Sequence, residues 1–162
     1  MARSLSQSAI FELWEEAQRP EQLGRRALPY WLKKLTAAKD EEVRAAAAHA
    51  LNNLLDRRAN SALIEVLQDI HESSRVRGEA AEALGCLNRS DKAPIVERTL
   101  IDCLSDRSAE VRFWCAYSLG QMKSRKAIPK LTELAKKDRA TVPKWWSVRK
   151  EARDALKEIE SR

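Results

Sequence analysis

Eight residues in the second half of the chain have side chains suited to holding a partner. Aromatic rings anchor protein partners at interface centres, and they also stack on nucleic-acid bases. Neighbouring cations attract acidic peptides or a phosphate backbone. We predict that these residues form one aromatic and basic binding surface. They are Phe113, Trp114, Tyr117, Lys144, Trp145, Trp146, Arg149 and Lys150.

The same aromatic residues have a structural alternative. Phe113, Trp114 and Tyr117 occupy helix positions expected to face solvent, yet one or two of them could pack against the unit that follows. The two adjacent tryptophans belong to a long link, DRATVPKWWS, which must cover its own apolar underside. We therefore expect one tryptophan of this pair to be buried and the other to be exposed.

Residue patterns typical of an enzyme active site do not occur in the sequence. There is no nucleophile elbow, phosphate-binding loop or His-Glu zinc motif, and glycine occurs only 4 times. His49 and His71 have no companion ligands at metal-binding spacing. The three cysteines, Cys86, Cys103 and Cys115, form no C-x-x-C motif and fit buried, reduced thiols. We expect no catalytic residue, no metal site and no cofactor.

The net charge of +6 lies wholly in the second half of the chain. Residues 1–81 hold 12 basic and 12 acidic side chains, whereas residues 82–162 hold 18 and 12. This asymmetry indicates an acidic partner or nucleic acid, and a solvated surface is the alternative. Apolar runs fall short of the roughly 18 residues that span a membrane, and the first twenty residues lack a signal-peptide pattern. We expect no membrane contact and a cytoplasmic location.

A twelve-residue pattern that predicts the helices positioning these residues occurs four times in the sequence. Twelve-residue phrases that open with Val-Arg start at Val43, Val76, Val111 and Val148. Their spacing of 33, 35 and 37 residues is typical of stacked helical repeats. Apolar or small residues at positions 1, 5, 8, 9 and 12 of each phrase mark one face of a helix. Positions 3, 4, 7 and 11 should then face solvent on the concave side of the stack.

Polar residues before the phrases indicate where these helices begin. Asp40, Ser73 and Ser108 can cap the first backbone amides of their helices. Trp145 occupies this place before the fourth phrase, so we expect no such cap there. Another helix precedes each phrase, which predicts antiparallel helix pairs. A leading helix near Gln7–Gln18 is predicted to cover the open end of the first pair.

The sequence therefore predicts an all-α fold, a right-handed α-α superhelix of about four helix pairs plus an N-terminal capping helix. Polar residues on the outer faces of both end helices favour a complete protein or domain. The predicted parts of this single domain, 1–162, are a cap helix and link at 1–26 and repeats at 27–55, 59–87, 92–122 and 125–160.

These phrases resemble those of the HEAT-like repeat family, especially the short bacterial type labelled phycobilisome-lyase HEAT-like. The family pattern, A-(V/I)-P-x-L-x-x-x-L-x-D then D-x-x-V-R-x-x-A-A-x-A-L-G-x-(L/I), is similar to AIPKLTELAKK and VRGEAAEALGCL. The resemblance covers about residues 27–160.

The resemblance implies a ladder of arginines that pair with loop acids between stacked units. Asp69 and Asp106 are the expected partners. The alternative is a row of four cations that contacts a phosphate backbone. The arginines, at position 2 of each phrase, are Arg44, Arg77, Arg112 and Arg149.

We predict a non-enzymatic scaffold or adaptor that binds a protein partner of acidic character through its third and fourth repeats. Two alternatives remain open. HEAT-like DNA glycosylases cradle a duplex, so nucleic-acid binding is one, and steep salt dependence would indicate it. Bilin-lyase subunits of similar fold attach or remove a tetrapyrrole, so a role as an enzyme subunit is the other.

Overall fold

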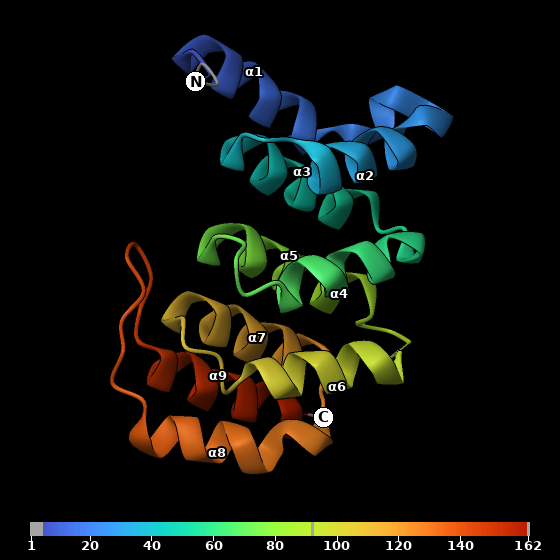
Figure 1. The fold of residues 1–162 in the computed structure, drawn as a ribbon. Helices are drawn as coiled ribbons and strands as arrows, with labels where there is room; N and C mark the ends of the chain where they lie inside the picture. Colours follow the sequence, from blue (N-terminus) through green and yellow to red (C-terminus); the bar gives the residue numbers. More distant parts are fainter. Residues whose placement is uncertain (1–4, 92, 162) are drawn as a thin grey trace.

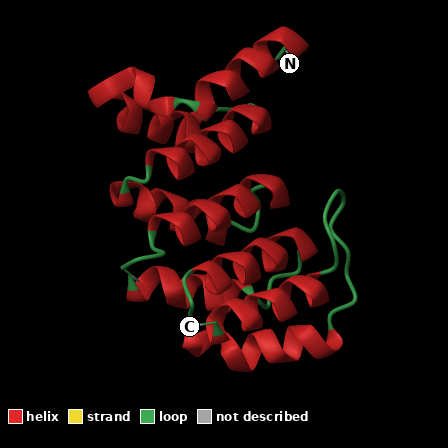
Figure 2. Ribbon diagram, turned by 180° about the vertical axis from the view of Figure 1, so that it is seen from behind, coloured by secondary structure: helices red, strands yellow, loops and turns green. Residues whose placement is uncertain are grey.

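The chain folds into a stack of helix pairs. The computed structural model describes residues 5–91 and 93–161, and Figures 1 and 2 show the stack from opposite sides. The α-helices of these ranges are α1 (Gln7–Gln18), α2 (Ala27–Ala37), α3 (Glu41–Leu54), α4 (Asn60–Gln68), α5 (Ser74–Leu87), α6 (Pro94–Cys103), α7 (Ala109–Gln121), α8 (Ile128–Lys137) and α9 (Val148–Glu160). The predicted all-α solenoid is confirmed. Within these ranges, no helix has the length and apolar character that crossing a bilayer requires.

The second helices of the pairs, α3, α5, α7 and α9, begin at side-chain caps. Asp40, Ser73 and Ser108 each accept a hydrogen bond from a backbone amide of the first turn, as predicted. The cap of α9 is Ser147, which corrects the expectation that the fourth phrase lacks one. The longer link moves Trp145 away from the helix start. Each cap of this type contributes about 1 kcal/mol to stability.

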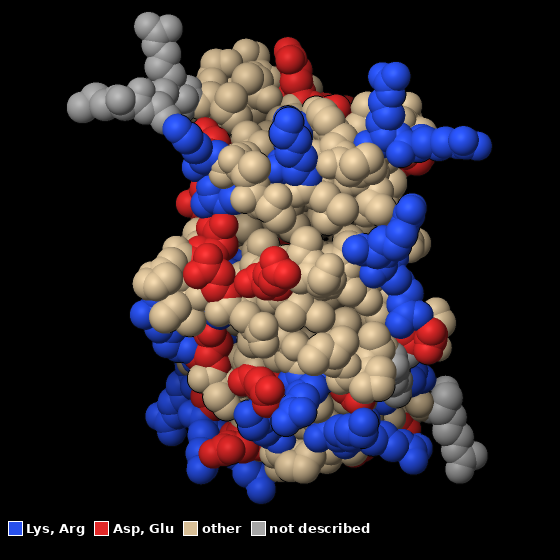
Figure 3. Space-filling model, turned by 45° about the vertical axis from the view of Figure 1, so that its right-hand side comes forward, with Lys and Arg blue, Asp and Glu red and all other residues tan. Residues whose placement is uncertain are grey.

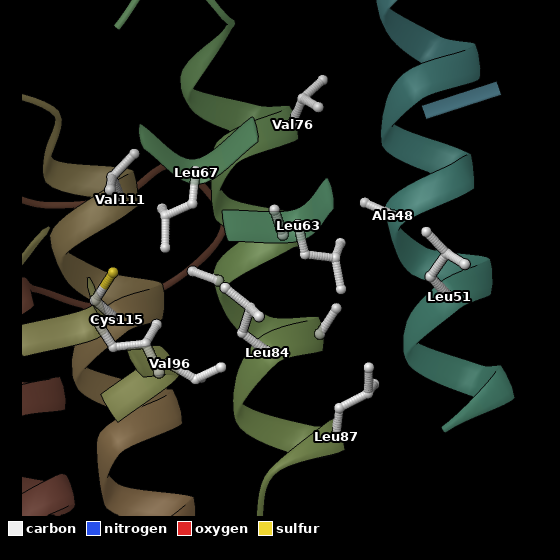
Figure 4. Packing of buried hydrophobic residues seen from close by; sticks show 14 of the residues in the cluster. Ala48, Leu51, Leu63, Leu67, Val76, Leu84, Leu87, Val96, Val111 and Cys115 are labelled. Carbon is white, nitrogen blue, oxygen red and sulfur yellow. The ribbon is translucent and has the colours of Figure 1, made fainter. Parts of the chain in front are cut away.

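One continuous apolar core runs through the stack. In Figure 4, Leu63 and Leu67 of α4 lie beside Leu84 of α5, and Val96 of α6 and Cys115 of α7 extend the same cluster. Small residues at the helix contacts let the second helices approach closely. Lys and Arg side chains gather over the end of the stack that holds α8, where Asp and Glu are interspersed (Figure 3).

Position 3 is buried in the first three phrases, although the sequence pattern placed it on the surface; in the fourth phrase it is the exposed Lys150. Ala45, Gly78 and Phe113 are all buried at this position. The reason is that the second helices stack directly on one another, α3 on α5, α5 on α7 and α7 on α9. A Cβ atom added to Gly78 would lie 2.6 Å from Cδ1 of Trp114. This position therefore requires a small residue in α5.

Arginines at position 2 form ion pairs along one edge of the stack. Arg77 pairs with Asp106, and Nε of Arg112 lies 2.7 Å from Oδ2 of Asp138. Each acid belongs to the loop that precedes the next second helix. Asp106 also accepts a hydrogen bond from the Ser108 amide at 2.8 Å, so it joins the arginine to the start of α7.

Arg44 pairs with Glu72, not with Asp69 as expected. Nη2 of Arg44 donates to Oε1 of Glu72 at 2.8 Å. Asp69 instead accepts from the backbone amide of His71 at 2.9 Å, because its carboxylate closes the turn that follows α4. The partner of an arginine is thus set by the local turn rather than by a fixed sequence offset.

Candidate functional site

The link between α8 and α9 is a hairpin that presents two tryptophans. The amide of Trp145 donates to the carbonyl oxygen of Val142 at 2.9 Å, which closes a turn through Pro143 and Lys144. Lys144 has a φ of 68°, the value found at the third residue of a type II turn, and proline favours the second. Figure 2 shows the hairpin projecting alongside the second helices. Its geometry leaves the Lys144 side chain exposed at the tip.

Val142 fastens this hairpin to the stack. Its side chain is buried in a small cluster with Phe113 and Val148. Phe113 is only 1% exposed, so the prediction that it contacts a partner is wrong. The hairpin folds back over α7 and covers position 3 of the phrase. Phe113 supports the site from beneath instead of forming part of its surface.

Four aromatic rings above Phe113 contact one another. Trp114 lies 5.2 Å from Trp145 between ring centroids, at 79° between planes, and 5.7 Å from Tyr117. Trp145 and Trp146 lie 6.0 Å apart, also nearly perpendicular. These edge-to-face contacts favour a fixed arrangement of the rings. The structure therefore brings together residues from α7 and from the hairpin.

Both hairpin tryptophans are exposed, Trp145 by 50% and Trp146 by 41%. The expectation that one of them is buried is wrong. Val142, not a tryptophan, fills the space beneath the hairpin. Trp114 and Tyr117 are half-buried at the base of the cluster.

The cations expected in this surface are largely paired with groups of the protein itself. Nζ of Lys150 lies 4.0 Å from the ring centroid of Trp146 and 2.7 Å from Oδ2 of Asp154. Arg149 donates from Nη2 to the carbonyl oxygen of Lys136 at 2.9 Å, at the end of α8. The structure thus does not gather these cations into a basic groove.

Carboxylates stand beside the aromatic rings. A cavity of about 180 Å³ opens between α7 and α9, with aromatic walls from Tyr117 and Trp146. Trp146 donates from Nε1 to Oε2 of Glu151 at 2.8 Å, and burial raises the pKa of Glu151. Two further acids, Asp154 and Glu158, complete the polar lining. The cavity suits a positively charged group with a flat or narrow head.

The acidic character continues onto α5. Oε2 of Glu79 lies 3.5 Å from Nδ1 of His49, and this contact raises the pKa of His49. Glu82 is partly buried, and among the described residues its carboxylate has no hydrogen bond or ion pair. Burial, together with repulsion from Glu79, raises the pKa of Glu82 to about 7. We call the solvent-facing side of α3, α5, α7 and α9 the second-helix face.

Glu82→Gln should stabilise the protein at alkaline pH. Between the usual pKa of 4.5 and the folded value of about 7, the folded state holds a proton that the unfolded chain has lost. Stability due to Glu82 therefore falls as pH rises through this window. We expect the variant to unfold with a free energy higher by about 1 kcal/mol at pH 8, a figure reduced for partial exposure. The charged and titratable groups around Glu82 are Glu79, Cys86, Arg89, His49 and Tyr117.

Urea unfolding at pH 4 and pH 8 checks this expectation. At pH 4 the two proteins should be equally stable, because Glu82 is then neutral in both states. Glu65→Gln, an exposed change on α4, serves as the control and should show no difference that depends on pH. Equal stability of Glu82→Gln and the wild type at pH 8 would contradict the raised pKa.

A larger cavity at the edge of the stack is a weaker candidate for a binding site. A cavity of about 370 Å³ lies at the edge of the stack between α6 and α8. Its charged groups already pair with one another, Arg112 with Asp138 and Lys137 with Glu133. In residues 5–91 and 93–161, no group of three or more His, Cys, Asp and Glu side chains could hold a metal ion.

The family model for HEAT repeats matches residues 28–100 and 92–157, which together make up most of the chain. The chain belongs to the HEAT repeat family. The resemblance seen in the Val-Arg phrases is thereby confirmed. A search of curated proteins found no match to this HEAT-repeat protein.

Solved structures share the fold. The complex of CpcE and CpcF of phycocyanin lyase from Nostoc sp. PCC7120 is 20% identical, with a TM-score of 0.72 over 93% of this chain and 99% of that chain. A designed armadillo repeat protein in complex with the peptide (KR)4 is 21% identical, with a TM-score of 0.62 over 96% and 77%. An engineered protein is 24% identical, with a TM-score of 0.57 over 95% and 72%. At these identities the likeness shows the fold alone.

The carboxylates of the second-helix face are the residues that sequence reasoning missed. Glu82 and Asp154 at position 7, and Glu158 at position 11, look like ordinary surface acids in the sequence. The available signal was their register, since Glu82 and Asp154 occupy position 7 of their phrases, as Tyr117 does. Aligning the copies by position places these acids on the same face as the rings.

Proposed function

We propose that this HEAT-repeat protein is a non-enzymatic scaffold or adaptor that binds a protein partner across the second-helix face of its third and fourth repeats. The exposure of Trp145 and Trp146, on a hairpin fastened by Val142, carries the proposal. Rigid, exposed aromatic side chains are typical of the energetic centres of protein interfaces. Repeat surfaces of this type present an extended face to their partners.

The acidic character predicted for the partner finds little support at this surface. Lys150 is paired with Asp154, and Arg149 is bound to the end of α8. The carboxylates beside the rings repel phosphate groups, which also disfavours nucleic acid as the ligand. Lys144, exposed at the hairpin tip, is the remaining cation of the predicted set.

A role as a subunit of a lyase is the second candidate. Its support is the likeness to the CpcE and CpcF complex over nearly the full length of both chains. Fold likeness by itself does not transfer activity. Titration of the purified protein with a linear tetrapyrrole, followed by visible absorption, separates the candidates. An unchanged absorption spectrum would rule out the role as a lyase subunit. A saturable shift of the tetrapyrrole absorption that is lost when Trp114 is replaced would support it.

The double variant Trp145→Ala, Trp146→Ala should lose its partner. We expect capture of that partner to fall at least about tenfold, because truncation of an aromatic anchor removes about 2 kcal/mol or more of binding free energy. Quantitative mass spectrometry of proteins captured by the immobilised variant and wild type measures the change.

The matched control removes two other exposed apolar side chains, Phe11 on α1 and Ile95 on α6. The double variant Phe11→Ala, Ile95→Ala should capture the same partner as the wild type. Equal capture by all three proteins would show that the aromatic cluster does not bind the partner.

A further inference from the structure

We propose that the partner presents a positively charged, extended segment, whose Lys and Arg heads bind between the rings and carboxylates of the second-helix face. This inference rests on the proposed function and names the chemistry of the partner. The charge of this partner is opposite to the one predicted from the net charge of the chain, because the binding face is acidic whereas the whole chain is basic.

The cavity between α7 and α9 has the groups that a guanidinium or ammonium requires. The rings of Tyr117 and Trp146 line it, together with three carboxylates. Glu151 accepts a hydrogen bond from Trp146, and Glu158 adds a further carboxylate. Asp154 pairs with Lys150 and Lys157 at the solvent-exposed rim. A cation gains from an aromatic face and from a carboxylate at the same time. Arginine suits such a site best, since its planar head stacks on a ring and donates from its edge.

One of the chain's own cations already adopts this arrangement. Nζ of Lys150 lies 4.0 Å from the ring centroid of Trp146 and 2.7 Å from Oδ2 of Asp154. The ring and the carboxylate therefore stand at the separation that a single ammonium group can bridge. The Lys150 side chain is itself exposed at the rim, so a partner's cation has access to the same groups.

A second cation site lies one helix away on α5. Glu82 is partly buried, and its carboxylate is without a hydrogen bond or ion pair in the described part of the chain. Glu79 beside it adds negative charge, only partly offset by His49. An incoming cation would supply the partner that this carboxylate lacks, and would favour its ionised form.

The two sites are spaced for an extended chain. Packed helices lie about 8–10 Å apart. The first site lies between α7 and α9 and the second on α5, so the two sites are about 12–15 Å apart. An extended segment advances about 3.3 Å per residue, so about four residues reach from one site to the other. Trp114 and Tyr117 of α7 lie between the sites and provide apolar contact for the intervening residues.

Anisotropy of fluorescein-labelled eight-residue peptides tests this inference. The probes are an alternating Lys-Arg peptide, an alternating Glu-Asp peptide, a Gly-Ser peptide and an oligonucleotide of eight thymidines, all at one ionic strength. We expect the Lys-Arg peptide alone to bind. The double variant Glu82→Gln, Glu158→Gln should weaken this binding about tenfold, since each lost charge-assisted contact weakens binding several-fold.

The control variant changes the same charge on the other side of the stack. Glu65 and Glu133 are exposed acids on α4 and α8, so Glu65→Gln, Glu133→Gln should bind the Lys-Arg peptide as the wild type does. Equal weakening by both double variants would overturn the inference, because it would show a general charge effect. The expected stability of Glu82→Gln at pH 8 separates loss of binding from loss of folding.

The remaining outcomes separate this inference from the proposed function. If the Lys-Arg peptide does not bind, the partner is not basic and the inference is wrong. If the acidic peptide binds and this binding requires Trp145, the inference of a basic partner is wrong but the proposed scaffold function stands. If the oligonucleotide binds and this binding requires Trp145, the inference is also wrong. If the protein self-associates and the double variant Glu82→Gln, Glu158→Gln abolishes this association, the occupant of the surface is a second copy of the chain. That result would overturn the proposal of an extended basic segment. The proposed function itself fails if the tryptophan variant keeps its captured partner, or if the oligonucleotide binds in a manner that requires Trp145.

Discussion

Arg77→Met should lower the free energy of unfolding by about 3–5 kcal/mol, the range for breaking a buried ion pair from one side. The Arg77 side chain is only 4% exposed and pairs with Asp106. Its Nε also donates to the carbonyl oxygen of Leu67 at 2.9 Å, which ties the end of α4 to α5. Methionine fills part of the volume but removes the donor to the Leu67 carbonyl and leaves the Asp106 carboxylate with the Ser108 amide and no cation. Urea unfolding followed by circular dichroism measures the loss.

An exposed ion pair provides the comparison for Arg77. Lys137 pairs with Glu133 one helical turn away on α8, and both side chains are well exposed. Lys137→Met should change stability by less than about 0.5 kcal/mol, as exposed pairs do. If Arg77→Met and Lys137→Met proved equally mild, the ion pairs at the edge of the stack would have no part in holding the repeats together.

Gly85→Ala should destabilise the protein by about 2–3 kcal/mol, although alanine is the better helix former by about 1 kcal/mol. A Cβ atom at this position would lie 2.5 Å from Cβ of Ser118 and 2.8 Å from its Cα. The obstacle is backbone, so α5 and α7 must move apart. Ser118 also donates from Oγ to the carbonyl oxygen of Ala81 at 2.8 Å, and this separation would break that bond. Thermal and urea unfolding measure the change.

Gly78→Ala is the matched substitution on the same helix. Its Cβ would meet Cδ1 of the Trp114 side chain at 2.6 Å, and a side chain can rotate away where a backbone cannot. We expect a smaller loss of stability than for Gly85→Ala, together with a shift in tryptophan fluorescence. A Gly85→Ala protein that is more stable than the wild type would contradict the close contact of α5 with α7.

The stack itself was predictable because each phrase encodes its own helix. The Val-Arg openings and the apolar stripe are local signals present in all four copies, and caps such as Asp40 and Ser73 precede the first three. The burial of Phe113 was not predictable from one helix alone. Its position faces the next second helix, and a folded-back hairpin covers it. The small residues at position 3 of the first two phrases, Ala45 and Gly78, were the sequence signal that this position contacts the next second helix.

The candidate site divides in a similar way. The sequence predicted that Trp114, Tyr117 and the hairpin tryptophans would form one surface, and the structure places these rings in contact. Their role in binding stays a prediction. The carboxylates beside them were not predicted, because Glu82 and Asp154 look like ordinary surface acids when each helix is viewed alone. Their shared position 7 is visible only when the phrases are aligned, and the stacking of the second helices brings that position to one face.

The hairpin at 138–147 separates the proposed binding surface from the packing of the helices. Val142 is its buried fastening point, whereas the four residues that follow, up to Trp146, are exposed to solvent and lie on the outside of the core. Substitutions at the tip are therefore free to change what is recognised while the helices keep their packing. Exchanging this short segment should therefore alter the surface that the protein offers to a partner and leave the stack of helices intact.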